Sequence, residues 1–484
     1  MKTNPNLERG RRFGRPLLLG AGGVAIATVV AVVVATGADY TDRGQFNYRV
    51  TAAGSPTPTP TPTETSTPPP APGLGTGVPT QNFSNVQSLA RSGSTLYGWA
   101  GPVTSGAGYG VADNVAQPVK VPAGTTLSEI AAGPSHNLAI DQNGDIWGWG
   151  FNNDGALAGA AALQFTPVKI TSGTTKFRKV AAGGYVNLNT GGNTSTSFAI
   201  DTGGNLWSWG RWNGGASTTW TVLGDGARAS RSAPKQITTG IDFVDVAAGW
   251  EKHAAVTRGG QVYTWGNGQY ASLALSDTYS TANVQTPTAS PFLSGIVKVA
   301  FGGRTAYALD REGYVWVWGN KSATMGASTL GIGTTNPAVS LLCKTPPGGE
   351  DGTARTSVCK PLRVPRVSGQ SAVIDISAGE SNIYALDDKG AVWAWGGNRF
   401  GNTGNDTIGT IANQDTLSPT RTTFQPGITI AGVVAEYFGG VAVDTNGGIW
   451  AWGRVGLNDL NLLGDGRTTA WGPLTNQPVP KKVK

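Results

Sequence analysis

One pattern of apolar and polar positions recurs seven times between about residue 85 and the C-terminus of this 484-residue chain. Its clearest copy covers residues 129–154 and reads EIAAGPSHNLAIDQNGDIWGWGFNND. The small-residue run, the Leu-Ala-Ile run and the two alternating tryptophans each predict a short β-strand. The polar Asp-x-x-Gly stretch between the last two runs predicts a hairpin turn in which glycine takes a positive φ. A proline-headed run at residues 166–170 predicts a fourth strand, since proline fits an outer edge.

A tryptophan in the third predicted strand marks every copy of this unit. These residues are Trp99, Trp149, Trp209, Trp265, Trp318, Trp395 and Trp452, at intervals of 50 to 77 residues. Seven four-stranded units at this period predict an all-β fold, a seven-bladed β-propeller. The Ala-Ala-Gly runs place small side chains on the strand nearest the crowded axis. Two aromatic residues at spacing two share one strand face, which we expect to pack against a neighbouring blade.

The composition supports short strands joined by many tight turns. The chain has 72 Gly, 29 Pro and 16 Trp, whereas helical bundles are poor in glycine. Its net charge of +7 is unevenly distributed, because the first 38 residues carry five basic side chains and one acidic side chain, which leaves +3 for the rest. Nucleic-acid binding requires basic residues concentrated on one face, so we predict no nucleic-acid partner.

The N-terminal part divides into a basic tail at residues 1–16, an apolar segment at 17–38 and a Pro/Thr-rich linker at 39–82. The 22 uncharged residues of the apolar segment suffice to cross a membrane as one helix, and the basic tail places the N-terminus in the cytoplasm. The linker prolines favour an extended spacer. We therefore predict a single-pass anchor in the cell membrane, with an extracytoplasmic propeller at residues 83–484. Cleavage of the segment as a signal peptide is the alternative and predicts a secreted protein.

The repeat resembles the regulator of chromosome condensation repeat family. Its unit combines Ala-Gly, a histidine, an aromatic-x-Trp-Gly strand, a Leu-Gly-x-Gly loop and a proline-headed strand. The matching residues are Gly133 with His136, Trp149 with Gly150, and the Leu-Gly-x-Gly runs at 223–226, 330–333 and 463–466. The resemblance covers roughly residues 85–484 and implies a seven-bladed propeller in a bacterial, membrane-anchored member. These motifs are structural and say little about function.

Departures from the family pattern affect the ends of the ring. The first unit lacks an Ala-Ala-Gly strand, the seventh has Glu436 in place of the glycine, and His253 stands one position later in its repeat than His136. The first unit is incomplete and the chain ends in QPVPKKV from Gln477. We therefore expect the C-terminal strand to close the ring with the N-terminal strands.

The chain offers few candidates for catalysis or metal binding. Both histidines occupy scaffold positions of the repeat, so we predict structural roles for them. The run DQNGD at 141–145 has the alternating oxygens of a calcium loop, but Asn152 stands where such a loop needs a carboxylate. We therefore predict no metal, no cofactor and no enzymatic activity.

Cys343 and Cys359 are the only cysteines, and both lie in the insertion that lengthens the fifth interval to 77 residues. In an exported protein, an even pair within one loop predicts a disulfide. The bond would stiffen the protrusion, and a stiff protrusion loses less entropy on binding.

The order of the strands predicts which end of the propeller binds a partner. In a four-stranded meander, the first-to-second and third-to-fourth loops emerge on one side, and the Asp-x-x-Gly hairpins emerge on the other. The first side gathers aromatic and charged residues, which are common interface anchors. They are Pro134, Tyr185, Trp250, Glu251, Arg304, Glu380 and Tyr437. We predict that they form the binding face together with the disulfide loop.

Two classes of function remain open. The favoured class is a non-catalytic, monomeric surface module that binds a protein or a cell-wall ligand. The family resemblance implies two versions, guanine nucleotide exchange on a small GTPase and inhibition of secreted β-lactamases. An exchange factor needs a cytoplasmic partner, which disagrees with the predicted anchor. The second class is an enzyme acting on polysaccharide, for which only Glu251, Glu380 and Glu436 lie near the expected channel mouth.

Overall fold

The computed structural model describes most of residues 113–484 and four short stretches before them. The described residues are 38–40, 46–48, 87–92, 95–100, 113–133, 135–152, 154–159, 163–186, 193–212, 221–320, 329–334, 338–344, 357–408, 415–436, 439–454, 456–457, 460–461 and 476–484. No helix within these ranges is long and apolar enough to span a bilayer. The predicted membrane segment at 17–38 lies outside them except for Ala38, as does the linker except for residues 39–40 and 46–48.

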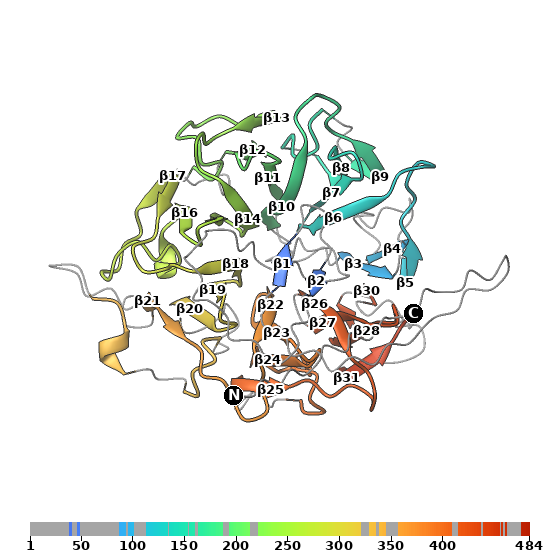
Figure 1. Cartoon of the computed structure of the whole chain (residues 1–484), viewed down its shortest axis with the longest axis vertical. Helices are drawn as coiled ribbons and strands as arrows, with labels where there is room; N and C mark the ends of the chain where they lie inside the picture. Colours follow the sequence, from blue (N-terminus) through green and yellow to red (C-terminus); the bar gives the residue numbers. More distant parts are fainter. Residues whose placement is uncertain are drawn as a thin grey trace, which may run out of the picture.

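Six four-stranded antiparallel sheets form the blades of a propeller. The strands of each blade are given from the innermost to the outermost. The first two blades are β6 (Leu127–Ala132), β7 (His136–Asp141), β8 (Ile146–Phe151) and β9 (Leu163–Lys169), then β10 (Phe177–Val186), β11 (Asn193–Asp201), β12 (Leu206–Gly210) and β13 (Arg231–Gln236). The third and fourth are β14 (Phe243–Ala248), β15 (Lys252–Thr257), β16 (Val262–Asn267) and β17 (Asn283–Ala289), then β18 (Ile296–Phe301), β19 (Thr305–Asp310), β20 (Val315–Asn320) and β21 (Ser357–Arg363). The fifth and sixth are β22 (Val373–Ala378), β23 (Asn382–Asp387), β24 (Val392–Gly397) and β25 (Asp415–Arg421), then β26 (Ile430–Glu436), β27 (Gly439–Asp444), β28 (Ile449–Gly453) and β31 (Gln477–Lys482). Figure 1 shows them around a common axis, with β6, β10, β14, β18, β22 and β26 nearest to it.

Apart from a three-stranded sheet, the other described elements are short. They are two hairpins, β1 (Ala38–Tyr40) with β2 (Phe46–Tyr48) and β29 (Gly456–Leu457) with β30 (Leu460–Asn461), and two single-turn 3-10 helices, η1 (Gln269–Ala271) and η2 (Val339–Leu341). The all-β class predicted from the sequence is therefore confirmed for the described part of the chain.

A three-stranded sheet stands between the last and first of these blades. It consists of β3 (Gln87–Ser92), β4 (Thr95–Ala100) and β5 (Asp113–Pro118), and β3 contacts β27 on one side and β6 on the other. Tyr97 of β4 pairs with Pro118 as Trp147 of β8 pairs with Lys169, so β3 is a second strand. The prediction of seven four-stranded blades is thus wrong: the described residues form six. The physical reason is the missing Ala-Ala-Gly strand, which leaves this sheet without an innermost strand among those residues.

The core lies between blades and depends on the second tryptophan of each third strand. Four of these indoles are fully buried and donate their N–H to a carbonyl of the preceding blade, at 2.6 to 3.1 Å. The pairs are Trp209 with Ala156, Trp265 with Val222, Trp318 with Ser272, and Trp452 with Asn402. These contacts confirm that the alternating aromatic residues pack against a neighbouring blade.

The first tryptophan of the third strand fixes the hairpin before it. In five blades its indole donates to the hairpin aspartate at 2.8 or 2.9 Å: Trp147 to Asp141, Trp207 to Asp201, Trp316 to Asp310, Trp393 to Asp387, and Trp450 to Asp444. The other carboxylate oxygen accepts backbone N–H groups of the turn, such as those of Glu312 and Tyr314. Gly144 takes the predicted positive φ, at 77°.

The C-terminal strand does not close the ring in the predicted way. β31 pairs with β28 of its own unit, with Lys482 opposite Trp450, so the expected pairing with the N-terminal strands is wrong. Without β31, β28 would present an unpaired edge, which explains why the last unit retains its own fourth strand. The ring closes by side-chain packing instead. Ala90 joins the apolar cluster of the last blade, and Nζ of Lys484 lies 5.3 Å from the Tyr97 ring centroid.

Candidate binding face

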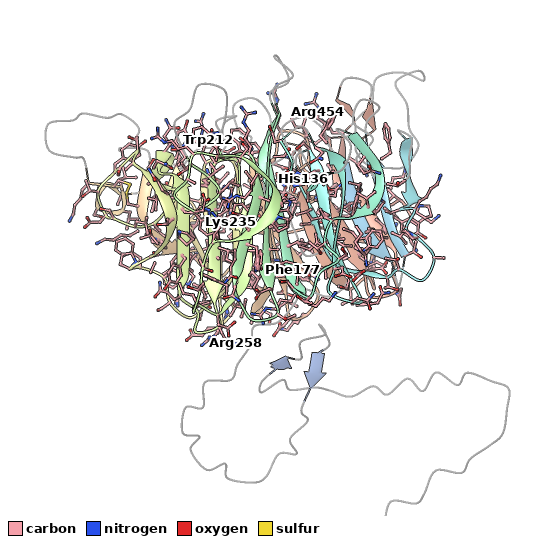
Figure 2. All side chains as sticks on the ribbon, turned by 90° about the horizontal axis from the view of Figure 1, so that it is seen from above. His136, Phe177, Trp212, Lys235, Arg258 and Arg454 are labelled. Atoms are coloured by element: carbon pink, nitrogen blue, oxygen red, sulfur yellow. A yellow bond between two sulfur atoms is a disulfide. The ribbon has the colours of Figure 1, made fainter. Side chains whose placement is uncertain are left out.

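The two ends of the propeller carry different connections. The first-to-second and third-to-fourth strand loops lie at one end, which we call the loop face. The Asp-x-x-Gly hairpins lie at the other end, which we call the hairpin face. In Figure 2, Trp212 and Arg454, which follow third strands β12 and β28, lie at one end, and Arg258, in the β15–β16 hairpin, lies at the other. This arrangement agrees with the one expected from the strand order.

Glycine begins the first-to-second loops of the first five four-stranded blades, because neighbouring blades approach closely there. A methyl group on Gly183 would lie 2.7 Å from Cβ of Ala248, and one on Gly379 would lie 2.4 Å from the carbonyl oxygen of Glu436. Real Cβ atoms do not approach other atoms so closely. The Ala-Ala-Gly run is therefore a consequence of crowding near the axis.

Hydrogen bonds join the first-to-second loops of four blades into a rim. Nζ of Lys252 donates to the carbonyl of Gly303 at 2.8 Å, and the N–H of Gly303 donates to the carbonyl of Glu380 at 3.2 Å. Nδ2 of Asn382 donates to the carbonyl of Gly439 at 3.2 Å. The rim holds the loop residues in place before any partner binds, which reduces the entropy lost on binding.

The family histidine position is occupied by residues that reach the next blade. His136 pairs opposite Gly150, and its Nε2 lies 2.9 Å from Oγ of Ser197. Lys252 pairs opposite Gly266, so Lys252 stands in the position of His136 in its own blade. The shift of His253 is visible in the sequence, but the bridging role of Lys252 was not predicted from it. The sequence could have indicated this role, because Lys252 directly precedes the shifted His253 and therefore occupies the usual histidine position.

Both histidines are fully buried, which fits the structural roles predicted for them. The His253 ring lies 4.5 Å from the Phe198 ring and 5.7 Å from the Trp265 ring, between centroids. Burial lowers the pKa of each imidazole to about 3. Among the described residues, no group of His, Cys, Asp or Glu side chains is arranged to hold a metal ion.

Lys252 and Glu251 place charge at the inner edge of the loop face. Burial lowers the pKa of Lys252 to about 8, although the carboxylates of Glu380 and Glu251 oppose this shift. Burial also raises the pKa of Glu251, whose Oε2 accepts a hydrogen bond from Asn267 at 2.8 Å. Both charged groups therefore have bonding partners within the propeller, and their contacts support the rim.

Arg304 and Tyr270 form the most distinctive contact of the loop face. The Arg304 guanidinium lies 4.8 Å from the Tyr270 ring centroid, and both side chains are half-buried. Tyr270 has a φ of 63°, which is strained for a bulky residue and is maintained only where the surroundings require it. Trp250, also half-buried, lies in the first-to-second loop of the same blade as Tyr270. Tyr270 was not predicted as a site residue, because nothing in the repeat pattern marks its backbone conformation.

The other predicted face residues have different outcomes. Glu380 is 1% exposed, so the expectation that it contacts a partner is wrong; its side chain fills the space next to Gly303. Tyr185 lies within β10, opposite Thr194 of β11, so it belongs to a strand and not to the loop in which it was expected. Pro134 and Tyr437 lie outside the described residues.

The predicted disulfide is present between Cys343 and Cys359. Cys359 belongs to β21, so the bond ties the insertion to the outer strand of its blade. Both cysteines are buried in a cluster with Tyr279 of the preceding blade, whose N–H donates to the carbonyl of Lys344 at 2.9 Å. The insertion therefore links two blades in addition to forming a loop.

Two family models describing the regulator of chromosome condensation (RCC1) repeat match this chain. One matches residues 128–156 and 373–402, and the other matches residues 143–188 and 259–309. Over these residues, which contribute strands to blades of the β-propeller, the chain is therefore similar to the RCC1 repeat.

Two curated relatives are each 27% identical to the chain over the aligned residues. Human E3 ubiquitin-protein ligase HERC2 is 27% identical over 394 residues, which are 79% of this chain but 7% of HERC2. The Ultraviolet-B receptor UVR8 of Arabidopsis thaliana is 27% identical over 384 residues, 77% of this chain and 76% of UVR8. The chain thus spans only a small part of HERC2 and about three quarters of UVR8. Both relatives are eukaryotic, so a bacterial origin stays a prediction.

Solved structures support the same fold. Prp20p from Saccharomyces cerevisiae has a TM-score of 0.61 at 20% identity and aligns over 84% of this chain and 88% of its own. The yeast RCC1 (Prp20) bound to Kap60 has a TM-score of 0.64 at 19% identity, over 90% of this chain and 91% of its own.

Proposed function

We propose that this chain is a non-catalytic propeller that binds a protein partner through its loop face. The observation that carries the proposal is the Arg304–Tyr270 contact, which lies on the same face as Trp250 and near a hydrogen-bonded rim. Trp, Tyr and Arg are the residue types that contribute most to protein interfaces. Each is half-buried here, so part of its surface remains available to a partner. A strained tyrosine at such a position is typical of a functional contact.

The relatives support binding as the class of function. One solved Prp20p structure is described with its binding to Gsp1p and histones, and another shows Prp20 bound to Kap60. We carry over only the ability to bind proteins, because the identity to those structures is 20% or less.

We further propose that the propeller acts outside the cytoplasm, attached to the cell membrane through residues 17–38. The support is the apolar segment of 22 residues after a basic tail. The disulfide agrees with this location, since disulfides persist in oxidising compartments.

The proposal can be tested by site-specific photo-crosslinking of the full chain in its own cells. A crosslinking amino acid at Gln269, next to Tyr270, should produce one discrete protein adduct, whereas the same group at Lys389 on the hairpin face should not. In the Gln269 background, Trp250→Ala and Arg304→Ala should each reduce the adduct about tenfold, because a true anchor contributes roughly 1 to 4 kcal/mol.

Folding must be measured in parallel with the crosslinking. The melting temperature of each variant should stay near that of the parent, since half-exposed loop residues contribute little to stability. An adduct unaffected by both substitutions would refute binding through this face. A large fall in melting temperature would instead identify the two residues as packing elements of the propeller.

A further inference from the structure

The hairpin face carries an arrangement of charged and aromatic residues that the loop face does not explain. Tyr314 lies in the β19–β20 hairpin, and the guanidinium carbons of Arg363 and Arg366 each lie 3.9 Å from its ring centroid. One face of a phenol ring has room for a single guanidinium at this distance. The two arginines therefore lie on opposite faces of the ring.

The backbone holds this stack in a fixed position. The N–H of Tyr314 donates to Oδ1 of Asp310 at 2.9 Å, and its carbonyl accepts from the N–H of Asp310 at 3.0 Å. Val364, between the two arginines, is buried, and its N–H donates to the carbonyl of Val315 at 2.8 Å. Val364 is anchored inside the blade, whereas Arg363 before it and Arg366 two positions after it are exposed.

A third arginine extends the cluster toward the next hairpin. One terminal nitrogen of Arg311 donates to the carbonyl of Arg258 at 2.7 Å, and one of Arg366 donates to the carbonyl of Glu312 at 2.7 Å. Arg311, Arg363 and Arg366 are all exposed, and no carboxylate of the described residues forms an ion pair with them. Stacking occupies the flat face of a guanidinium but leaves N–H groups at its edge able to bind an oxyanion.

We propose that Arg311, Tyr314, Arg363 and Arg366 form a second docking surface, which binds an acidic segment of a partner protein. The surface lies on the face opposite to Trp250 and is independent of the loop face. Planar guanidinium groups match carboxylates in a bidentate geometry, and preordered arginines lose less side-chain entropy on binding.

The surrounding acidic residues favour a protein partner over a uniform anionic surface. The exposed residue Glu312 lies within the cluster. Asp242, with 45% of its side chain exposed, forms an ion pair with Arg258, whose carbonyl accepts the hydrogen bond of Arg311. A phospholipid headgroup layer or phosphate polymer would place negative charge against these carboxylates. A protein segment can place its carboxylates opposite the arginines alone, so patterned charge favours a discrete partner.

Binding of a fluorescein-labelled polyglutamate peptide to the full chain in neutral detergent tests this proposal. We expect saturable binding that Arg363→Ala and Arg366→Ala each weaken about tenfold, or about 1.4 kcal/mol, because each removes a charge-assisted contact with the peptide. Arg363→Lys should weaken binding nearly as much, because lysine keeps the charge but lacks the planar fork.

Two matched controls on the same face define the specificity of the effect. Arg258 is already paired with Asp242 at 2.5 Å, so Arg258→Ala should change peptide affinity by less than about twofold. Lys389→Ala, in the β23–β24 hairpin, should behave in the same way. Melting temperatures of all variants should match that of the parent chain.

Several outcomes would overturn the proposal. Equal losses from Arg258→Ala and Arg363→Ala, or full affinity in Arg363→Lys, would show attraction by net charge alone. Displacement of the peptide by phosphatidylglycerol added to the micelles, with the same dependence on the variants, would identify a lipid surface as the ligand. A fall in melting temperature that accounts for the lost binding would show that the stack is structural.

Discussion

Acid should destabilise this propeller through its two buried imidazoles, His136 and His253. Both side chains are fully buried, and burial lowers the pKa of each from 6.5 to about 3, with the charge of Lys252 adding to the shift at His253. In the unfolded chain the two groups return to ordinary values. Between pH 6.5 and about 3 the unfolded state therefore binds more protons than the folded state, so the free energy of unfolding falls as the pH falls.

The size of the effect follows from the width of this window. At pH 5 the unfolded imidazole is almost fully protonated, and the folded one is neutral. Each histidine then lowers the free energy of unfolding by about 2 kcal/mol relative to pH 7, and the pair by about 4 kcal/mol. The carboxylates with lowered pKa values, such as those of Asp141 and Asp444, add their losses mainly below about pH 4. The raised pKa of Glu251 acts in the opposite direction, since its folded form binds a proton more readily.

The substitution His253→Leu separates the imidazole from other acid effects. Neither ring nitrogen of His253 has a hydrogen-bond partner in the described part of the chain, and the ring contacts Phe198 and Trp265. Leucine retains apolar contact and removes an unsatisfied buried polar group, so stability at pH 7 should change by less than about 1 kcal/mol. The loss between pH 7 and pH 5 should fall to about half, or roughly 2 kcal/mol.

Guanidinium denaturation followed by tryptophan fluorescence, repeated at pH 7, 6 and 5, measures both quantities. The reasoning is refuted if His253→Leu shows the same loss between pH 7 and pH 5 as the parent chain. It is refuted equally by a parent chain whose unfolding midpoint is constant across that range.

Three further predictions follow from the fold. Mass analysis without reductant should find Cys343 linked to Cys359 with no alkylatable thiol, and replacing both by serine should lower the free energy of unfolding by about 3 kcal/mol, because the bond spans 16 residues. Ala158→Gly should raise the free energy of unfolding by about 0.5 kcal/mol in denaturant titrations, since Ala158 has a strained φ of 48° and another blade has Gly331 at the equivalent position. A lower free energy of unfolding in this variant would refute backbone strain at Ala158. Protease added to intact, wall-free cells should degrade the propeller, whereas protection until lysis would refute the extracytoplasmic location.

The repeat pattern allowed the strands, the hairpins and the between-blade role of the tryptophans to be predicted from the sequence. Each depends on local rules, such as the two-residue alternation of Trp316 and Trp318 or the Asp310 turn with its glycine, and these rules are the same in every unit. The number of complete blades and the pairing of β31 could not be derived in this way. The pairing of β31 depends on whether β28 or an N-terminal strand is the better partner for it, and the local residue pattern of β31 does not decide between them.

The candidate sites depended on contacts between units, and the sequence predicted them less well. Glu380 was expected at the surface because it lies in a loop, but its side chain is buried in the space next to Gly303. Tyr270 was missed because its position depends on a left-handed backbone and on Arg304 of the following blade. Loop membership predicts the end of the propeller at which a residue lies, but not whether its side chain is exposed.

The innermost strands carry a charge pattern that is visible in the sequence but was not used to predict the fold. The residue just after the register shift in each of five consecutive inner strands is charged and alternates in sign: Glu129, Lys179, Asp245, Lys298 and Asp375. Nζ of Lys179 lies 3.0 Å from Glu129 and 3.3 Å from Asp245, and Lys298 pairs with Asp375. Burial opposes the charge of Lys179, yet its two carboxylate neighbours raise its pKa above the ordinary value.

Alternation of this kind favours one order of blades, because exchanging two neighbours would bring like charges together. Strict alternation of sign cannot continue around a closed ring with an odd number of positions, because two like charges would then be neighbours. In this chain it stops at β26, where Gly432 takes the equivalent register, and the adjoining β3–β5 sheet has no inner strand among the described residues. The break in the charge pattern thus coincides with the place where the ring closes. There the blades are held by apolar packing around Ala90 and Val441, which places no constraint on the sign of a neighbour.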